Sequence, residues 1–221
     1  MTREELIKKV ALKMDEISSS DDVIVPVGIG DNNPLYTQIN NLLNESVNDV
    51  LMKAPIYRLG NHVNKINTST PKEHATAKDE KGQPRKVAVI DVPNDFIRIV
   101  SITDKAFQRP IVDLAIEGDD IDKRQYNKHL VAKSAKPVAV IGRGEQGRVI
   151  TCYSYSPEDT PNPIMNYIKR YDVDKDITDE TNLDDYMIDL VSWVCAGRVF
   201  AAQGDINKGK LCDENAAALM V

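Results

Sequence analysis

The fold of this chain is decided by the stretch Lys136-Pro-Val-Ala-Val-Ile-Gly-Arg-Gly-Glu-Gln-Gly-Arg-Val-Ile-Thr-Cys-Tyr-Ser-Tyr155. Within it, Gly142 to Gly147 spell the G-x-G-x-x-G pattern of dinucleotide-binding folds. That fingerprint needs a helix after the glycines, because the helix start presents free N–H groups to the pyrophosphate. The residues that follow here are β-branched and aromatic, without a helical period. The sequence therefore predicts a β-hairpin with a glycine turn, and a nucleotide-binding loop is the alternative.

Other strand patterns surround this hairpin. A run upstream, over residues 86–103, is rich in Val and Ile, and Ile164–Ile168 predicts one more strand that packs on the hairpin. Between Asp113 and Leu130 the signal is weak and indicates a short helix or an irregular excursion. We therefore expect an antiparallel β domain over residues 86–170.

Helical patterns mark both ends of the chain. Thr2 and Glu5 have the spacing of a capping box, followed by an apolar period to about Ser18. A second helix is predicted over 34–53, with the asparagines of its polar face in solvent or in a subunit contact. The longest helix is predicted over 183–203.

This longest helix carries two further signals. It ends before a glycine, Gly204, and it contains the small pair Ala196 and Gly197, which would let another helix approach closely. Tyr186, Trp193 and Phe200 recur every seven residues and line up along one flank. Such a row favours core packing over a partner contact.

These patterns predict an α+β fold, in which a helical bundle of N-terminal helices and a long C-terminal helix holds an inserted antiparallel β domain. The helical domain comprises residues 1–59 and 171–204, and the β insert comprises 86–170. The polar segment 60–85 is predicted as a long loop. Residues 205–221 have helical propensity but a thin apolar face, and are predicted to be a C-terminal docking tail.

Composition limits the function classes. The 221 residues suit one domain or two closely joined ones, and 28 basic against 34 acidic residues give a formal charge of −6. This balance argues against a tight duplex-DNA binder. Three separated cysteines favour reduced thiols in a cytosolic setting. The charged N-terminus is unlike a signal peptide, and no apolar run reaches the length of a membrane span.

The sequence offers few candidates for catalysis. Three histidines lack a second metal ligand at i+3 or i+4, namely His62, His74 and His129. Residues 172–183 place aspartates as in an EF-hand loop, but Ile177 and Leu183 occupy the positions of the required Gly and Glu. The acid pairs at Asp119 and Asp184 are predicted to lie in loops or at helix starts. No catalytic, cofactor-binding or metal-binding residue is predicted.

The order of these elements resembles that of the head–tail connector (adaptor or ring) proteins of short-tailed bacteriophages, in particular the ring proteins of crAss-like phages. The resemblance rests on Pro93-Asn-Asp-Phe-Ile-Arg-Ile-Val-Ser101, the downstream Arg109-Pro110, the hairpin up to Tyr153 and the closing helix 184–202. The segment 60–84 has no counterpart in the family pattern. The aromatic expected after Ser101 is displaced to Phe107.

The resemblance implies a virion structural subunit of the neck and tail region, made in the host cytoplasm, that is not an enzyme. It implies a twelve-fold homo-oligomeric ring under the portal protein that also contacts the next tail or ring protein. Genomic double-stranded DNA would pass through the lumen without sequence-specific binding, and neither a membrane nor a cofactor is involved. The aromatic row and the tail supply the candidate assembly contacts, which are Trp193, Phe200, Leu211, Leu219 and Met220. The alternative is a soluble nucleotide-binding enzyme that uses Gly142–Gly147.

Overall fold

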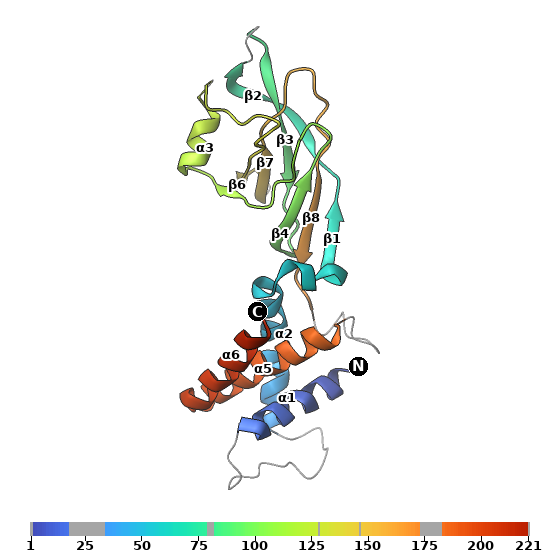
Figure 1. Cartoon of the computed structure of the whole chain (residues 1–221), viewed down its shortest axis with the longest axis vertical. Helices are drawn as coiled ribbons and strands as arrows, with labels where there is room; N and C mark the ends of the chain where they lie inside the picture. Colours follow the sequence, from blue (N-terminus) through green and yellow to red (C-terminus); the bar gives the residue numbers. More distant parts are fainter. Residues whose placement is uncertain are drawn as a thin grey trace. The chain divides into compact units, whose positions relative to one another are not determined.

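The computed structural model describes residues 2–17, 34–78, 82–127, 129–145, 147–172 and 183–220 (Figure 1). The chain forms two compact units. A helical unit comprises Met1–Asn61 and Arg170–Val221, and a β unit comprises His62–Lys169. The α+β class predicted from the sequence is confirmed, with helices at both ends of the chain and strands between them.

Among its described residues, the helical unit contains four α-helices, which are α1 (Arg3–Ile17), α2 (Pro34–Lys53), α5 (Asp185–Ala202) and α6 (Ile206–Leu219). The predicted capping box is present at the start of α1. The Glu5 backbone N–H donates to Thr2 Oγ1 at 3.2 Å, and the Thr2 backbone N donates to Glu5 Oε2 at 2.7 Å. The cap predicted for α2, Asn33, lies outside the described residues, as do residues 18–33 as a whole.

Helix α5 is the centre of this unit and packs against α1, α2 and α6. Its buried residues lie on all sides of the helix, as expected for a helix that is covered all round. Asp184 caps it by accepting from the Met187 backbone N–H at 2.8 Å. Arg198 joins it to α2 by ion pairs with Glu45 at 2.8 Å and with Asp49 at 3.3 Å.

The prediction of a docking tail over 205–221 is wrong about its structure, because this segment forms α6 and packs on α5 within the chain. Gly204 adopts a φ of 87° and reverses the chain between the two helices. The helices meet at Gly197 and Gly209, where a Cβ on Gly197 would lie 3.2 Å from the Gly209 carbonyl oxygen. The small residues predicted to admit another helix therefore admit α6.

One residue of the polar face of α2 has a structural task. The Asn48 side chain donates to the Tyr171 carbonyl and accepts from the Tyr171 backbone N–H, both at 2.8 Å. These two bonds fasten the chain where it re-enters the helical unit after the β unit. The expectation that the asparagines of this face lie in solvent or in a subunit contact is therefore wrong for Asn48.

The described residues of the β unit form two sheets. The three-stranded sheet has the order β1-β8-β4, and the five-stranded sheet has the order β2-β3-β7-β6-β5. The strands are β1 (Val63–Ile66), β2 (Thr70–Lys78), β3 (Pro84–Asp91), β4 (Phe96–Thr103), β5 (Ala115–Ile116), β6 (Ala139–Gly144), β7 (Gly147–Cys152) and β8 (Ile164–Lys169).

The core of the β unit lies between the two sheets. Ile90 and Ile150 from the five-stranded sheet form one buried cluster with Ile102 and Met165 from the three-stranded sheet. The predicted strand at 164–168 therefore packs on the hairpin as expected, through this core. The fully buried Tyr155 donates its hydroxyl to Asp104 Oδ2 at 3.0 Å.

Two expectations for the β unit need correction. The segment 60–85 is not a long loop, because β1 pairs with β8 and β2 pairs with β3. The insert is not wholly antiparallel, because β5 pairs with β6 in parallel. The predicted short helix is present as α3 (Asp120–Gln125), capped by Asp119.

The run Pro93–Ser101, which carries the family resemblance, has structural tasks at β4. The Phe96 ring stacks on the ring of Tyr167 in β8 with centroids 5.9 Å apart, and Asp95 accepts from the Tyr167 hydroxyl at 3.3 Å. Ser101 Oγ accepts from the Asn166 side chain at 3.0 Å. These residues join β4 to β8 and hold the three-stranded sheet together.

Candidate functional site

The glycines of the G-x-G-x-x-G pattern lie in a hairpin. Strands β6 and β7 pair antiparallel up to Gly144 and Gly147, and β7 continues as a strand from Gly147. The predicted hairpin is confirmed. No helix follows Gly147 within the described part of this segment, so the N–H groups that would hold a pyrophosphate in a dinucleotide fold are not gathered here.

Each glycine of the pattern makes room or turns the chain. A Cβ on Gly142 would lie 2.5 Å from Glu117 Oε2, the atom that accepts from the Arg143 backbone N–H at 3.0 Å. A Cβ on Gly144 would lie 2.6 Å from Cγ1 of Val149. Gly147 has a φ of 146°. Packing and turn geometry therefore account for these glycines without a ligand.

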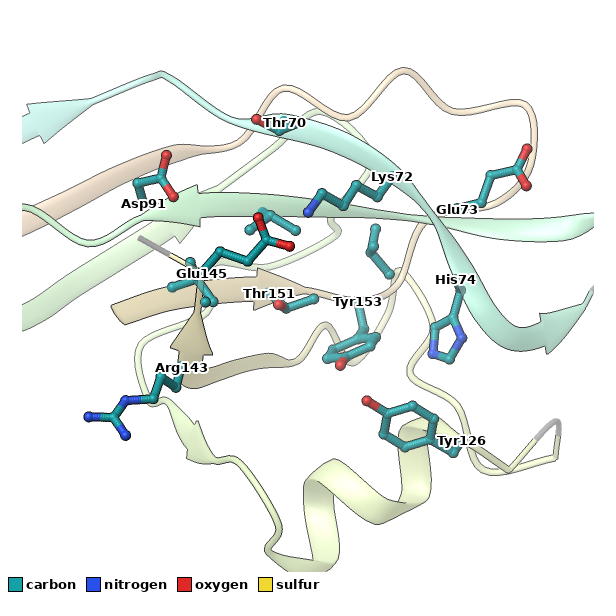
Figure 2. A pocket seen from close by; sticks show the side chains of 14 residues that line it. Thr70, Lys72, Glu73, His74, Asp91, Tyr126, Arg143, Glu145, Thr151 and Tyr153 are labelled. Carbon is teal, nitrogen blue, oxygen red and sulfur yellow. The ribbon is translucent and has the colours of Figure 1, made fainter. Parts of the chain in front are cut away.

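A hollow of about 570 Å³ lies beside this hairpin, on the face of the five-stranded sheet that is turned away from the core (Figure 2). Alternation along the strands builds its floor. In β3 and β7, Ile90 and Ile150 enter the core, whereas their neighbours Val89 and Val149 line the hollow. We call this hollow the sheet groove.

One end of the sheet groove is aromatic. The His74 ring lies 5.5 Å from the ring of Tyr126 and 5.4 Å from the ring of Tyr153, measured between centroids. Burial lowers the pKa of His74, and the charge of Arg85 lowers it further, whereas a hydrogen bond with the Gln125 backbone opposes the shift. Because a lowered pKa favours the neutral imidazole, this end of the groove presents uncharged rings at neutral pH.

The rim of the sheet groove carries charges of both signs. Lys72 and Arg143 are basic, and Glu73, Asp91 and Glu145 are acidic. Figure 2 shows Lys72 and Glu145 extending over the hollow, whereas Arg143 points away from it. An apolar floor within a rim of mixed charge is the composition of a protein–protein contact surface.

The segment 111–130 of the same unit, which we call the excursion, carries five large apolar side chains that expose between 44% and 67% of their surface. They are Val112, Ile116, Ile121, Tyr126 and Leu130. Tyr126 also lines the sheet groove, so the groove and the excursion adjoin. Five exposed apolar side chains within one segment make the excursion a candidate interaction surface.

The sequence did not reveal the groove as a site. Thr70, Lys72 and His74 belong to β2, which was predicted as a loop, and Tyr126 belongs to the segment with a weak signal. The β-branched Thr70 and Thr76 were the available signs of a strand.

The predicted assembly contacts divide into two groups. Trp193 and Phe200 are 9% and 3% exposed and belong to the core of the helical unit, as their helical spacing favoured. Leu211 and Leu219 are exposed on α6, and Met220 is half-buried just after it. The last three remain candidates for a contact surface.

The described residues offer no metal-binding site. No group of three His, Cys, Asp or Glu side chains that could hold a metal ion occurs among those residues. His74 lies in the aromatic end of the groove, and His129 is exposed on the excursion. Most of the EF-hand-like segment, residues 173–182, lies outside the described part.

The three cysteines are buried and free, as the sequence predicted for reduced thiols. Burial raises the pKa of Cys195 and of Cys212 to about 11 and raises the pKa of Cys152 still further. Because the thiolate is the nucleophile, all three are poor candidates for covalent catalysis.

Comparison of the sequence with models of protein families found no match, and comparison with curated proteins found none either. Within the described part of the chain, no helix has both the length and the hydrophobicity needed to cross a membrane.

Proposed function

We propose that the chain is a structural subunit of the head–tail connector of a short-tailed phage. In this proposal it forms a homo-oligomeric ring, of twelve copies, under the portal protein and against the next tail or ring protein. Genomic double-stranded DNA passes through the lumen during packaging and ejection. The protein acts in the neck of the virion and is not an enzyme.

The observation that carries this proposal is the presence of exposed apolar side chains on both units. Twelve large apolar side chains are exposed among the described residues, and they lie on both units. Those of the helical unit include Leu12, Tyr57 and Ile206, and those of the β unit lie on the excursion. A ring needs contacts between unlike faces of one subunit, and two different units with exposed apolar residues offer such faces.

Charge and the resemblance support the same proposal. With a net charge of −6, the subunit repels phosphates, so that a duplex in the lumen slides and does not adhere. The residues that carry the family resemblance at 93–101 join β4 to β8 and so hold the three-stranded sheet together.

The nucleotide-binding alternative has lost the feature that suggested it, because Gly142–Gly147 form a hairpin. Calorimetry with nucleotides distinguishes it from the connector proposal. Submillimolar binding that is abolished by Gly144→Val would restore the alternative, whereas we expect no heat of binding from ATP, GTP or NAD.

Negative-stain microscopy with purified portal particles tests the connector proposal. We expect an added annular density on the portal when the chain is present. Ile116→Asp places a charge on the excursion and is expected to weaken this density, whereas Thr103→Asp, at an exposed polar position of the same unit, serves as the matched control. Portal particles that never gain density with the wild-type chain would contradict the proposal.

A further inference from the structure

A second hollow of the β unit, of about 360 Å³, gathers cations and hydroxyl groups from segments far apart in the sequence. It lies between β3, the turn before β6 and the loop after β7. Its polar lining consists of Arg85, Lys133, Ser134, Ser154, Ser156 and Asp159. None of these residues lines the sheet groove, so the two hollows have separate walls.

The two cations of this hollow, Arg85 and Lys133, have no ion-pair partner in the part of the chain that the structure describes. Arg85 donates from Nε to the Tyr155 carbonyl at 3.2 Å, and this bond fixes the side chain. The two terminal nitrogens of the guanidinium remain as donors for a ligand. Because acidic residues outnumber basic ones in this chain and give it a net charge of −6, the overall composition does not explain two cations on one hollow.

Ser154 is held in an unusual conformation at this hollow. Its φ of 98° makes it the one non-glycine residue with a left-handed φ in the described part of the chain. The side chain is 4% exposed, and its Oγ accepts from the Val138 backbone N–H at 3.2 Å. The hydroxyl hydrogen of Ser154 has no acceptor among the described residues. Strained residues of this kind cluster at ligand clamps, where the fold holds a donor in place.

The single carboxylate of the hollow is held by the loop that carries it. Asp159 Oδ2 accepts from the Ser156 backbone N–H at 2.6 Å and from Ser156 Oγ at 2.8 Å. Arg85 and Lys133 contribute two positive charges against one negative charge from Asp159, so the formal charge of the lining is +1. The hollow therefore favours an anion.

We propose that this hollow binds a small oxyanion, either a phosphate group or a carboxylate group. Arg85 supplies a planar pair of donors that matches the oxygens of either group, and Lys133 adds a second charge. Ser154 donates its hydroxyl hydrogen from a position fixed by Val138. This inference is independent of the connector proposal, because it rests on the lining of this hollow and not on the exposed apolar side chains of the two units.

The test is a titration of the ¹⁵N-labelled full chain, followed by the amide signals, with inorganic phosphate and separately with glutarate at constant ionic strength. We expect saturable shifts confined to Ser154, Ser156 and their neighbours. Saturation by phosphate alone assigns the site to a phosphate group, and saturation by glutarate assigns it to a carboxylate. Shifts that fail to saturate with both anions, or that spread evenly over the surface, would overturn the proposal.

Variants separate binding from folding. Arg85→Gln and Lys133→Gln are each expected to weaken the affinity for the saturating anion about tenfold, as loss of a charge-assisted bond does. Lys210→Gln, which removes an exposed charge from the helical unit, is the matched control and should leave the affinity unchanged. Ser154→Gly permits the same φ without a side chain, so it should fold and bind more weakly. A folded Ser154→Gly protein with unchanged affinity, or an equal loss in Lys210→Gln, would refute the assigned donors.

Discussion

The two units both depend on glycines that allow close approach, but the atoms that approach differ. In the helical unit, a Cβ on Gly197 would lie 3.1 Å from Asp213 Oδ1 and 3.2 Å from both the Cβ of Cys212 and the Gly209 carbonyl oxygen, all on α6. In the β unit, Gly142 and Gly144 face side chains, the carboxylate of Glu117 and a methyl group of Val149. The Gly209 carbonyl oxygen and the Cβ of Cys212 cannot move without shifting helix α6, whereas the carboxylate of Glu117 can rotate away from Gly142. The helix crossing is therefore expected to tolerate an added side chain less well than the position of Gly142.

The largest effect is expected from the core of the helical unit. Trp193→Ala should lower the free energy of unfolding by about 3–5 kcal/mol, because a large buried aromatic leaves a cavity. Trp193 is 9% exposed, and Lys13 Nζ lies 4.8 Å from its ring centroid. Urea unfolding followed by circular dichroism measures the change. Tyr57→Ala, at a residue 72% exposed in the same unit, is the control, expected within about 0.5 kcal/mol of wild type. A small loss for Trp193→Ala would instead place this residue in a subunit interface.

The helical crossing is the next target. Gly197→Val should cost about 2–3 kcal/mol, because the added atoms meet Asp213, Cys212 and the Gly209 backbone at 3.1–3.2 Å. Gly60→Val supplies the control, since a Cβ on Gly60 meets no atom within 4 Å. Equal unfolding free energies for the two variants would show that α6 does not pack on α5 as described.

The hairpin should respond less. Gly142→Ala is expected to cost about 1 kcal/mol or less, because the new Cβ displaces Glu117 and breaks its bond to the Arg143 N–H. A double-mutant cycle with Glu117→Ala measures this directly, and in the Glu117→Ala background the glycine substitution should add almost nothing. A larger loss for Gly142→Ala than for Gly197→Val would reverse the comparison between the units.

The smallest effect is a pH dependence of the β unit. Burial lowers the pKa of His74 below its ordinary 6.5, so the unfolded chain binds a proton more readily than the folded one. Above pH 6.5 the ring of His74 is neutral in both the folded and the unfolded chain, so its burial does not make the folding free energy depend on pH there. Stability should be lost as the pH falls below 6.5, and the loss is complete once the pH is below the folded pKa. His74→Phe should flatten this part of the stability curve, as measured by thermal melting from pH 7.5 to 5. An unchanged slope would show that another group titrates there.

The elements that sequence reasoning found share a clear period or end signal. The capping box of α1, the end of α5 before Gly204 and the hairpin at Gly144 follow from local rules that act over a few residues. The small pair at Ala196 and Gly197 also predicted a close helix contact, and Gly197 does lie against α6.

The elements that were missed lack a hydrophobic signal. Helix α6 buries Gly209, Cys212 and Ala216, whose small side chains give a weak apolar face although they permit close packing. Strand β2 lines the groove with Thr70 and Lys72, so alternation of apolar and polar residues does not mark it. The groove itself joins strands that are distant in the sequence, and pairing of that kind is set by the tertiary fold.

Assembly is the central claim, and mass photometry of the purified chain, alone and with portal particles, tests it most directly. We expect a species of about twelve subunits, each of 24.6 kDa, that becomes more abundant when portal is added. A protein that stays monomeric at every concentration and never associates with the portal would contradict the account.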